Sequence, residues 1–147
     1  MARQYKRLGG KFLYETDFPY LTMPGPLAGP DLEHARRLFR DVGKCIECHL
    51  PGGKVMVGKT KADLAPDLTH VRARLAPKWV IHWFEGPGNY QPRTRMPNFW
   101  PLEKGVRGSI DEQIGDANRE MQLLRDYLYS DDFRADYEKI ASTVKTK

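Results

Sequence analysis

Two cysteines and a histidine stand together in the sequence, in the segment Cys45-Ile46-Glu47-Cys48-His49. Two thiols at this spacing can reach the two vinyl groups of one porphyrin and form thioethers, and the histidine that follows then lies under the metal. The C-x-x-C-H pattern is therefore typical of covalent c-type haem attachment. We expect Cys45 and Cys48 to hold one haem c and His49 to bind its iron as the proximal ligand.

Two other kinds of site contain closely spaced cysteines. A thioredoxin-like pair would open a helix after a buried strand, and no strand pattern precedes Lys44. A zinc site would need two more close ligands, and His70 and His82 do not stand in a paired ligand spacing. The sequence thus favours haem over a redox cysteine pair or a zinc-binding interaction module.

The sixth position of the iron holds either a second ligand or no protein ligand. Met96 lies in a predicted loop, and Pro97 after it favours an extended backbone that can cross the distal face. Thioether ligation raises the reduction potential relative to a second histidine and suits electron transfer. We expect Met96 to be the distal ligand, and the alternatives are Met56, Met23, a histidine or an open position.

Apolar residues at spacings of three and four predict helices in four parts of the chain. We expect these helices at residues 31–43, 77–86, 109–128 or 116–128, and 133–140. Asp31 is the predicted N-cap of the first helix and Gly43 its end, whereas Asp131 and Asp132 should interrupt the chain before the last helix. No strand alternation or internal repeat is visible. The predicted class is all-α with long loops, which usually serve a function.

The composition indicates one globular domain with extensions. The chain has 147 residues, of which 40% are hydrophobic, and no apolar run is long enough to cross a membrane. We divide it into a proline- and aromatic-rich arm at 1–30 that docks on its own domain, a domain at 31–130, and a helical tail at 131–147. The basic start lacks a following apolar segment, so no export signal is visible, and we expect a cytoplasmic chain or a mature or excised piece.

Positive charge gathers around the cysteines. The net charge is +5, and residues 31–106 carry thirteen Lys and Arg against eight Asp and Glu. The basic residues that bracket the attachment segment are Arg36, Arg37, Arg40, Lys44, Lys54, Lys59 and Lys61. They predict docking to an acidic patch on a redox partner protein. Nucleic acid is not an expected partner, because the chain has neither a continuous basic run nor a known reading motif.

Beyond the attachment segment, about residues 31–130 resemble monohaem class I cytochromes c. The matching segments are 35–39 in the first helix, Pro66-Asp67-Leu68-Thr69 on the proximal side, Trp79 and Trp83 in the middle helix, Thr94-Arg95-Met96-Pro97 in the distal loop and 124–128 in the last helix. The resemblance implies a cytochrome c fold, with three main helices and long loops around one haem. The first and last helices would cross with Phe39 against Tyr127, and Ala35 stands where the family usually has glycine. The arm and the tail have no counterpart.

The resemblance also implies roles for individual residues. The Pro66 carbonyl would accept a hydrogen bond from the second ring nitrogen of His49 and fix the orientation of the ring. Trp83 would line the haem pocket, with its indole N–H near a propionate. Arg72 and Arg95 would pair with propionates, because the guanidinium fork suits a carboxylate.

The function that the resemblance implies is one-electron transfer by the haem iron, without enzymatic catalysis. The chain would be a free carrier, or the cytochrome domain or subunit of a larger membrane-bound respiratory complex. It would work in the periplasm or in another compartment outside the cytoplasm. The alternative is a gas-binding haem sensor or a peroxidase-type enzyme, either of which needs an open or labile sixth position.

Overall fold

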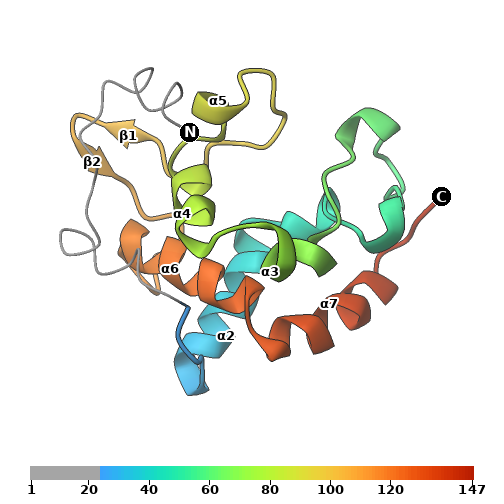
Figure 1. The fold of residues 1–147 in the computed structure, drawn as a ribbon, viewed down its shortest axis with the longest axis horizontal. Coiled ribbons are helices and arrows are strands. Elements are labelled where there is room, and N and C mark those ends of the chain that lie inside the picture. The colour runs from blue at the N-terminus through green and yellow to red at the C-terminus, as the bar shows by residue number, and fades with distance from the viewer. Residues whose placement is uncertain (1–23) are drawn as a thin grey trace.

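The computed structural model describes residues 24–147, and Figure 1 shows that they are mostly helical, with one small sheet. The helices are α2 (Gly29–Arg37), α3 (Val71–Arg74), α4 (Pro77–Glu85), α5 (Pro87–Tyr90), α6 (Ala117–Leu128) and α7 (Asp131–Ser142). Strand β1 (Leu102–Glu103) pairs antiparallel with β2 (Val106–Arg107). The predicted mostly helical class is confirmed. Residues 1–23 of the predicted arm at 1–30 lie outside the described residues, and so does the predicted ligand role for Met23.

The first helix begins earlier than predicted and does not use the predicted cap. α2 starts at Gly29 with Pro30 in its first turn, and the N-cap residue Ala28 offers no side-chain hydrogen bond. Asp31 lies inside that turn, where its carboxylate pairs with the Arg119 guanidinium of α6. The prediction of Asp31 as N-cap is therefore wrong, because a partner from another helix takes its side chain.

The chain leaves α2 through a π-helical turn, Leu38–Val42, that runs up to the attachment segment. The Gly43 N–H donates to the Leu38 carbonyl (2.8 Å), so Gly43 ends the helix as predicted. A Cβ atom at Gly43 would lie 2.9 Å from that carbonyl oxygen and 3.2 Å from the Cys45 Sγ. Lys44 then adopts a left-handed conformation (φ 48°) and turns the backbone toward the thiols. Position 43 therefore requires glycine, because a side chain there would be too close to the Leu38 carbonyl and the Cys45 thiol.

The hydrophobic core lies where α2 and its π-helical turn pack against α6. Phe39 packs edge-on against Tyr127 with ring centroids 6.0 Å apart, which confirms the predicted contact. Ala35 is fully buried in the same core. The rings of Phe133 and Tyr137 from α7 lie 5.3 and 6.2 Å from that of Phe39. The π-helical turn after α2 therefore shares one aromatic cluster with α6 and α7, which come much later in the sequence.

Proline and aspartate set the starts of the next two long helices. Pro77 occupies the first turn of α4, as predicted. The Asp116 carboxylate accepts hydrogen bonds from the N–H groups of Asn118 (2.8 Å) and Arg119 (3.2 Å), and α6 begins just after it. Of the two predicted starts, the one near Asp116 is correct, because the Ser109 hydroxyl binds the Glu120 carboxylate in the first turn of α6 and does not cap a helix of its own.

The segment predicted as loop between residues 86 and 108 contains α5 and the β1–β2 hairpin. Lys104 (φ 51°) and Gly105 (φ 82°) form the two-residue connection. Positive φ at both positions is what a type I′ hairpin turn requires, and Asn-Gly or Asp-Gly is its usual signal. The prediction of no strand is therefore wrong for these residues, because Lys-Gly is a weak signal for the turn.

The predicted break between the last two helices exists, but it lies at Tyr129 and Ser130 rather than at Asp131 and Asp132. The Ser130 hydroxyl caps α7 by accepting a hydrogen bond from the Phe133 N–H (3.0 Å). Both carboxylates then lie in the first turn, where the helix dipole stabilises negative charge. Because Phe133 and Tyr137 are almost fully buried, α7 belongs to the core of the domain rather than to a separate tail.

Candidate functional site

The C-x-x-C-H segment forms a short 3₁₀ turn at Cys45–Glu47, and a backbone hydrogen bond then joins its last residue to its first. The His49 N–H donates to the Cys45 carbonyl at 2.9 Å, so the chain folds back over the first cysteine. Both thiols are free and partly buried. Burial raises the pKa of the Cys45 thiol to about 12. A redox-active cysteine pair needs a lowered thiol pKa, and the segment before Lys44 is helical rather than a strand, so the thioredoxin-like alternative is not supported.

The imidazole of His49 is oriented by the backbone. Its Nδ1 lies 2.7 Å from the Pro66 carbonyl oxygen, and a carbonyl can only accept, so Nδ1 carries the proton. The predicted hydrogen bond between these two residues is confirmed. Burial lowers the pKa of His49, which keeps the ring neutral. A neutral imidazole with a protonated Nδ1 presents the lone pair of Nε2, the form in which histidine binds a metal.

The proximal segment is tied to the chain that follows the histidine. The Ala65 N–H donates to the Cys48 carbonyl (3.2 Å). The Asp67 carboxylate accepts hydrogen bonds from the N–H groups of Gly52 (2.8 Å) and Thr69 (2.8 Å). Asp67 was not among the predicted site residues, although the D-x-T spacing is a signal for such a side-chain turn. These bonds hold Pro66 opposite His49.

Met96, in the loop after α5, contacts Trp83 of α4. The Trp83 indole N–H donates to the Met96 Sδ at 2.8 Å. Trp83 also stacks on Trp79, with ring centroids 5.2 Å apart, and its ring lies 6.4 Å from that of Tyr90. The structure therefore brings together Met96, the predicted distal ligand, and Trp83, which was predicted to line the haem pocket. The indole N–H that was expected near a propionate contacts the Met96 sulfur.

Met56, an alternative ligand, is held by the last residues of the chain. It forms a bridge with Thr146, and the Lys147 N–H donates to the Val55 carbonyl (3.0 Å). Its side chain lines a groove of about 430 Å³ together with Ile46 and residues from the end of α7. Met56 thus has a packing role at the C-terminal residues.

The two arginines predicted to bind propionates are engaged with carboxylates in different places. Arg72 pairs with Asp131 at the start of α7 (3.0 Å), and its side chain is 56% exposed. Arg95 pairs with Asp63 (3.1 Å) and is 63% exposed. The second pair joins the Met96 loop to the 3₁₀ turn Lys61–Asp63. Each of the two guanidinium groups is therefore paired with a carboxylate of the chain itself.

Most of the basic residues around the attachment segment are paired within the chain. The ion pairs are Arg36 with Asp136 (2.7 Å), Arg37 with Asp111, Arg40 with Asp41 (2.8 Å) and Lys59 with Glu47 (3.4 Å). Within residues 24–147, Lys44, Lys54 and Lys61 are exposed and form no ion pair. The positive surface near the thiols is therefore smaller than the sequence implies.

The two thiols and the imidazole of one segment, and the thioether in the Met96 loop, are the donor types that suit a covalently held haem iron. Nowhere between residues 24 and 147 do three or more His, Cys, Asp or Glu side chains gather as zinc would require. No helix in this part of the chain is both long and apolar enough to span a membrane. Comparisons with protein-family models, curated proteins and solved structures gave no match to this chain.

Proposed function

We propose that this protein transfers single electrons through one haem c, attached by thioethers to Cys45 and Cys48 and bound at the iron by His49 and Met96. The observation that carries the proposal is the geometry of His49. The Pro66 carbonyl accepts a hydrogen bond from its Nδ1–H at 2.7 Å, which leaves Nε2 for a metal, and the residue directly before it, Cys48, carries a free thiol, as does Cys45. When bound, the haem supplies an iron that cycles between Fe(III) and Fe(II).

The residues of the chain orient the two proposed ligands of the iron. The hydrogen bond from His49 to Pro66 fixes the ring and raises its basicity as a ligand. The Trp83 indole N–H restrains the Met96 sulfur, which has a second lone pair for a metal. Trp79 stacks on Trp83, so packing holds the indole that contacts the sulfur. Arg72 and Arg95 would exchange their present carboxylate partners for propionates.

The same proposal covers the role of the protein, its partner proteins and the compartment in which it works. The chain acts as an electron carrier or as the cytochrome subunit of a larger membrane-bound respiratory complex, and not as an enzyme on its own. Its exposed lysines Lys44, Lys54 and Lys61 face an acidic patch on a redox partner. It works outside the cytoplasm, in a periplasmic or equivalent compartment, because that is where the resemblance implies that the thioethers form.

The test is a visible spectrum of the purified protein in both redox states, followed by precipitation in acid acetone. A pigment that stays with the protein and gives a low-spin spectrum in both states supports the proposal. A colourless protein, or a pigment that washes out, overturns it.

Substitution identifies the distal ligand. Met96→Ala should convert the iron to a high-spin form that binds CO, and should lose the absorption band expected of methionine–iron ligation. Met56→Ala is the matched control, because Met56 packs against the C-terminal residues instead, and it should leave the spectrum unchanged. A wild-type protein that is already high-spin and takes up CO would favour the sensor or peroxidase alternative.

A further inference from the structure

A single hydroxyl group from α7 joins the two segments that orient His49. The Tyr137 side chain is 2% exposed. Its hydroxyl donates to the His49 carbonyl oxygen (3.0 Å) and accepts a hydrogen bond from the Leu68 N–H (3.2 Å). Leu68 lies two residues after Pro66, whose carbonyl accepts from the His49 ring. The hydroxyl therefore closes a hydrogen-bonded loop around the imidazole.

Packing holds the Tyr137 ring in place. The ring stacks on Phe133 with centroids 4.9 Å apart and meets Phe39 edge-on at 6.2 Å. Neither neighbour lets the ring move without opening the aromatic cluster between α2, α6 and α7. The position of the hydroxyl is thus fixed by the core rather than by a mobile surface loop.

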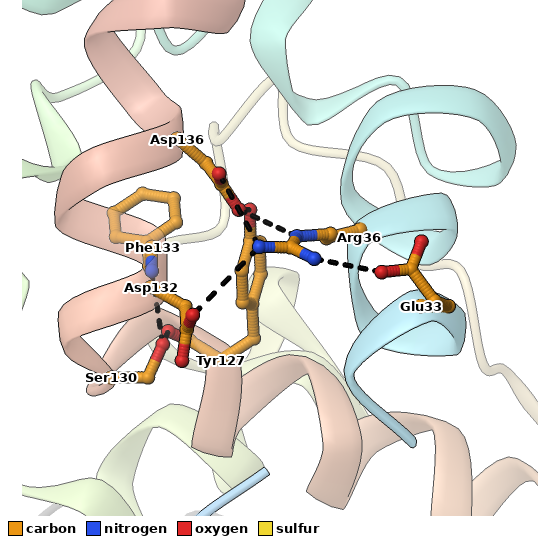
Figure 2. A network of polar contacts seen from close by, with 7 residues as sticks. All are labelled: Glu33, Arg36, Tyr127, Ser130, Asp132, Phe133 and Asp136. Atoms are coloured by element: carbon orange, nitrogen blue, oxygen red, sulfur yellow. Dashed lines mark hydrogen bonds and ion pairs between the residues drawn. The ribbon is translucent and has the colours of Figure 1, made fainter. Parts of the chain in front are cut away.

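A polar network shown in Figure 2 fixes α7 itself. The Arg36 Nε of α2 donates to Asp136 (2.7 Å), the residue before Tyr137, and the Tyr127 hydroxyl of α6 donates to the same carboxylate (2.9 Å). Arg36 also binds Glu33 on its own helix (2.7 Å). The two-nitrogen contact of Arg36 with Asp136 therefore holds α7 against α2 beside Tyr137, and this ion pair remains when the Tyr127 hydroxyl is removed.

We propose that Tyr137 is a positioning residue for the His49 imidazole. By tying the His49 backbone to the segment that carries the Pro66 carbonyl, its hydroxyl sets the strength of the hydrogen bond between ring and carbonyl. That bond controls the basicity of the ring as a ligand, and through it the reduction potential of the iron. The inference rests on the proposed function. Burial raises the pKa of Tyr137 to about 12, so the hydroxyl keeps the proton that it donates.

The experiment compares Tyr137→Phe with Tyr127→Phe in the haem-loaded protein. Both variants remove one buried hydroxyl from the same core, but only the first removes a group that contacts the His49 and Leu68 backbone. In Tyr137→Phe the Leu68 amide should exchange its hydrogen about fivefold faster or more, as the loss of one hydrogen bond implies. The reduction potential should rise, because a less basic imidazole stabilises Fe(III) less.

In Tyr127→Phe the Leu68 exchange rate and the potential should stay at their wild-type values. A Tyr137→Phe protein that matches wild type in both, or two variants that shift alike, overturns the inference. If Tyr137→Phe does not fold, difluorotyrosine at position 137 keeps the ring and the hydroxyl but alters both hydrogen bonds. The potential and the exchange rate must then differ from wild type, and the same replacement at position 127 must leave them unchanged.

The two proposals fail in different ways. A wild-type protein without covalent haem refutes the proposed function, whereas Leu68 exchange in the tyrosine variants still reports on the hydrogen bonds. A protein with covalent haem whose potential does not respond to Tyr137→Phe leaves electron transfer standing and refutes the positioning role alone.

Discussion

Gly43 ends the π-helical turn and leaves room for the Cys45 thiol. A methyl group there would lie 2.9 Å from the Leu38 carbonyl oxygen and 3.2 Å from the Cys45 Sγ. Gly43→Ala should therefore destabilise the fold by about 1–3 kcal/mol, as overpacking does. It should also lower the ratio of haem absorbance to protein, because the thiol must move. Urea unfolding and absorbance measure the two effects.

Gly88 supplies the control for this substitution. It lies in α5, and a Cβ atom there would have no neighbour within 4 Å. Gly88→Ala should leave both the stability and the haem content close to wild type. Equal losses in the two variants would show that close packing at Gly43 is not the cause.

The buried carboxylate of Glu120 fixes the loop that leads into α6. It accepts hydrogen bonds from the Trp100 indole (2.7 Å), from the N–H groups of Ile110 (3.0 Å) and Asp111 (2.9 Å), and from the Ser109 hydroxyl. Glu120→Gln places an amide donor against other donors and should cost about 2 kcal/mol in urea unfolding. The chain between α5 and α6 should loosen with it.

An exposed glutamate tests whether that loss is specific. Glu112→Gln lies in the same segment on the surface and should change the unfolding free energy by less than about 0.5 kcal/mol. A Glu120→Gln protein as stable as this control would refute the anchoring role of the buried carboxylate.

At the scale of elements, local signals were predictable and long-range partners were not. Pro77 and Asp116 start helices through contacts within the next few residues, and the sequence predicted Pro77 outright and Asp116 as one of two possible starts. Asp31 has the same local signal, but Arg119, 88 positions away in sequence, binds its carboxylate. For the candidate site, the hydrogen bond of His49 followed from the resemblance. The tyrosine of α7 that braces it did not, because a spacing pattern marks it only as core.

Alkaline unfolding should report on the packing of α6 against α7. Burial raises the pKa of Tyr137 from 10.0 to about 12, and burial also raises that of Tyr127. The folded state favours the neutral phenol, so this stabilisation is complete below the unfolded pKa of about 10 and is lost as the pH rises toward about 12. In urea titrations Tyr137→Phe should show a shallower decline over this range than wild type. An identical decline would contradict the assignment.

At the scale of the whole molecule, paired and unpaired cations have different consequences. Arg36 and Arg37 neutralise carboxylates within the chain, whereas Lys44 and Lys61 are exposed next to the attachment segment. Lys44→Gln with Lys61→Gln should slow electron exchange with an acidic partner about threefold or more at low salt, and the difference should vanish at high salt. Stopped-flow kinetics at several ionic strengths measure it.

A matched double variant separates local from global charge. Lys104→Gln with Lys139→Gln removes the same net charge from exposed positions on the hairpin and on α7. It should slow the exchange much less. Equal slowing by both double variants would mean that net charge alone, and not a surface beside the thiols, attracts the partner.

The π-helical turn Leu38–Val42 has a consequence for every residue that follows it. Such a turn holds one residue more than an α-helical turn, and each residue advances an α-helix by about 100°. A chain shortened by one position here would keep the phase of Ala35 and the residues before it, but would rotate Cys45 and His49 by roughly that angle about the axis. The additional residue of the π-helical turn therefore sets the rotation of the cysteine pair about the helix axis without changing how α2 packs in the core.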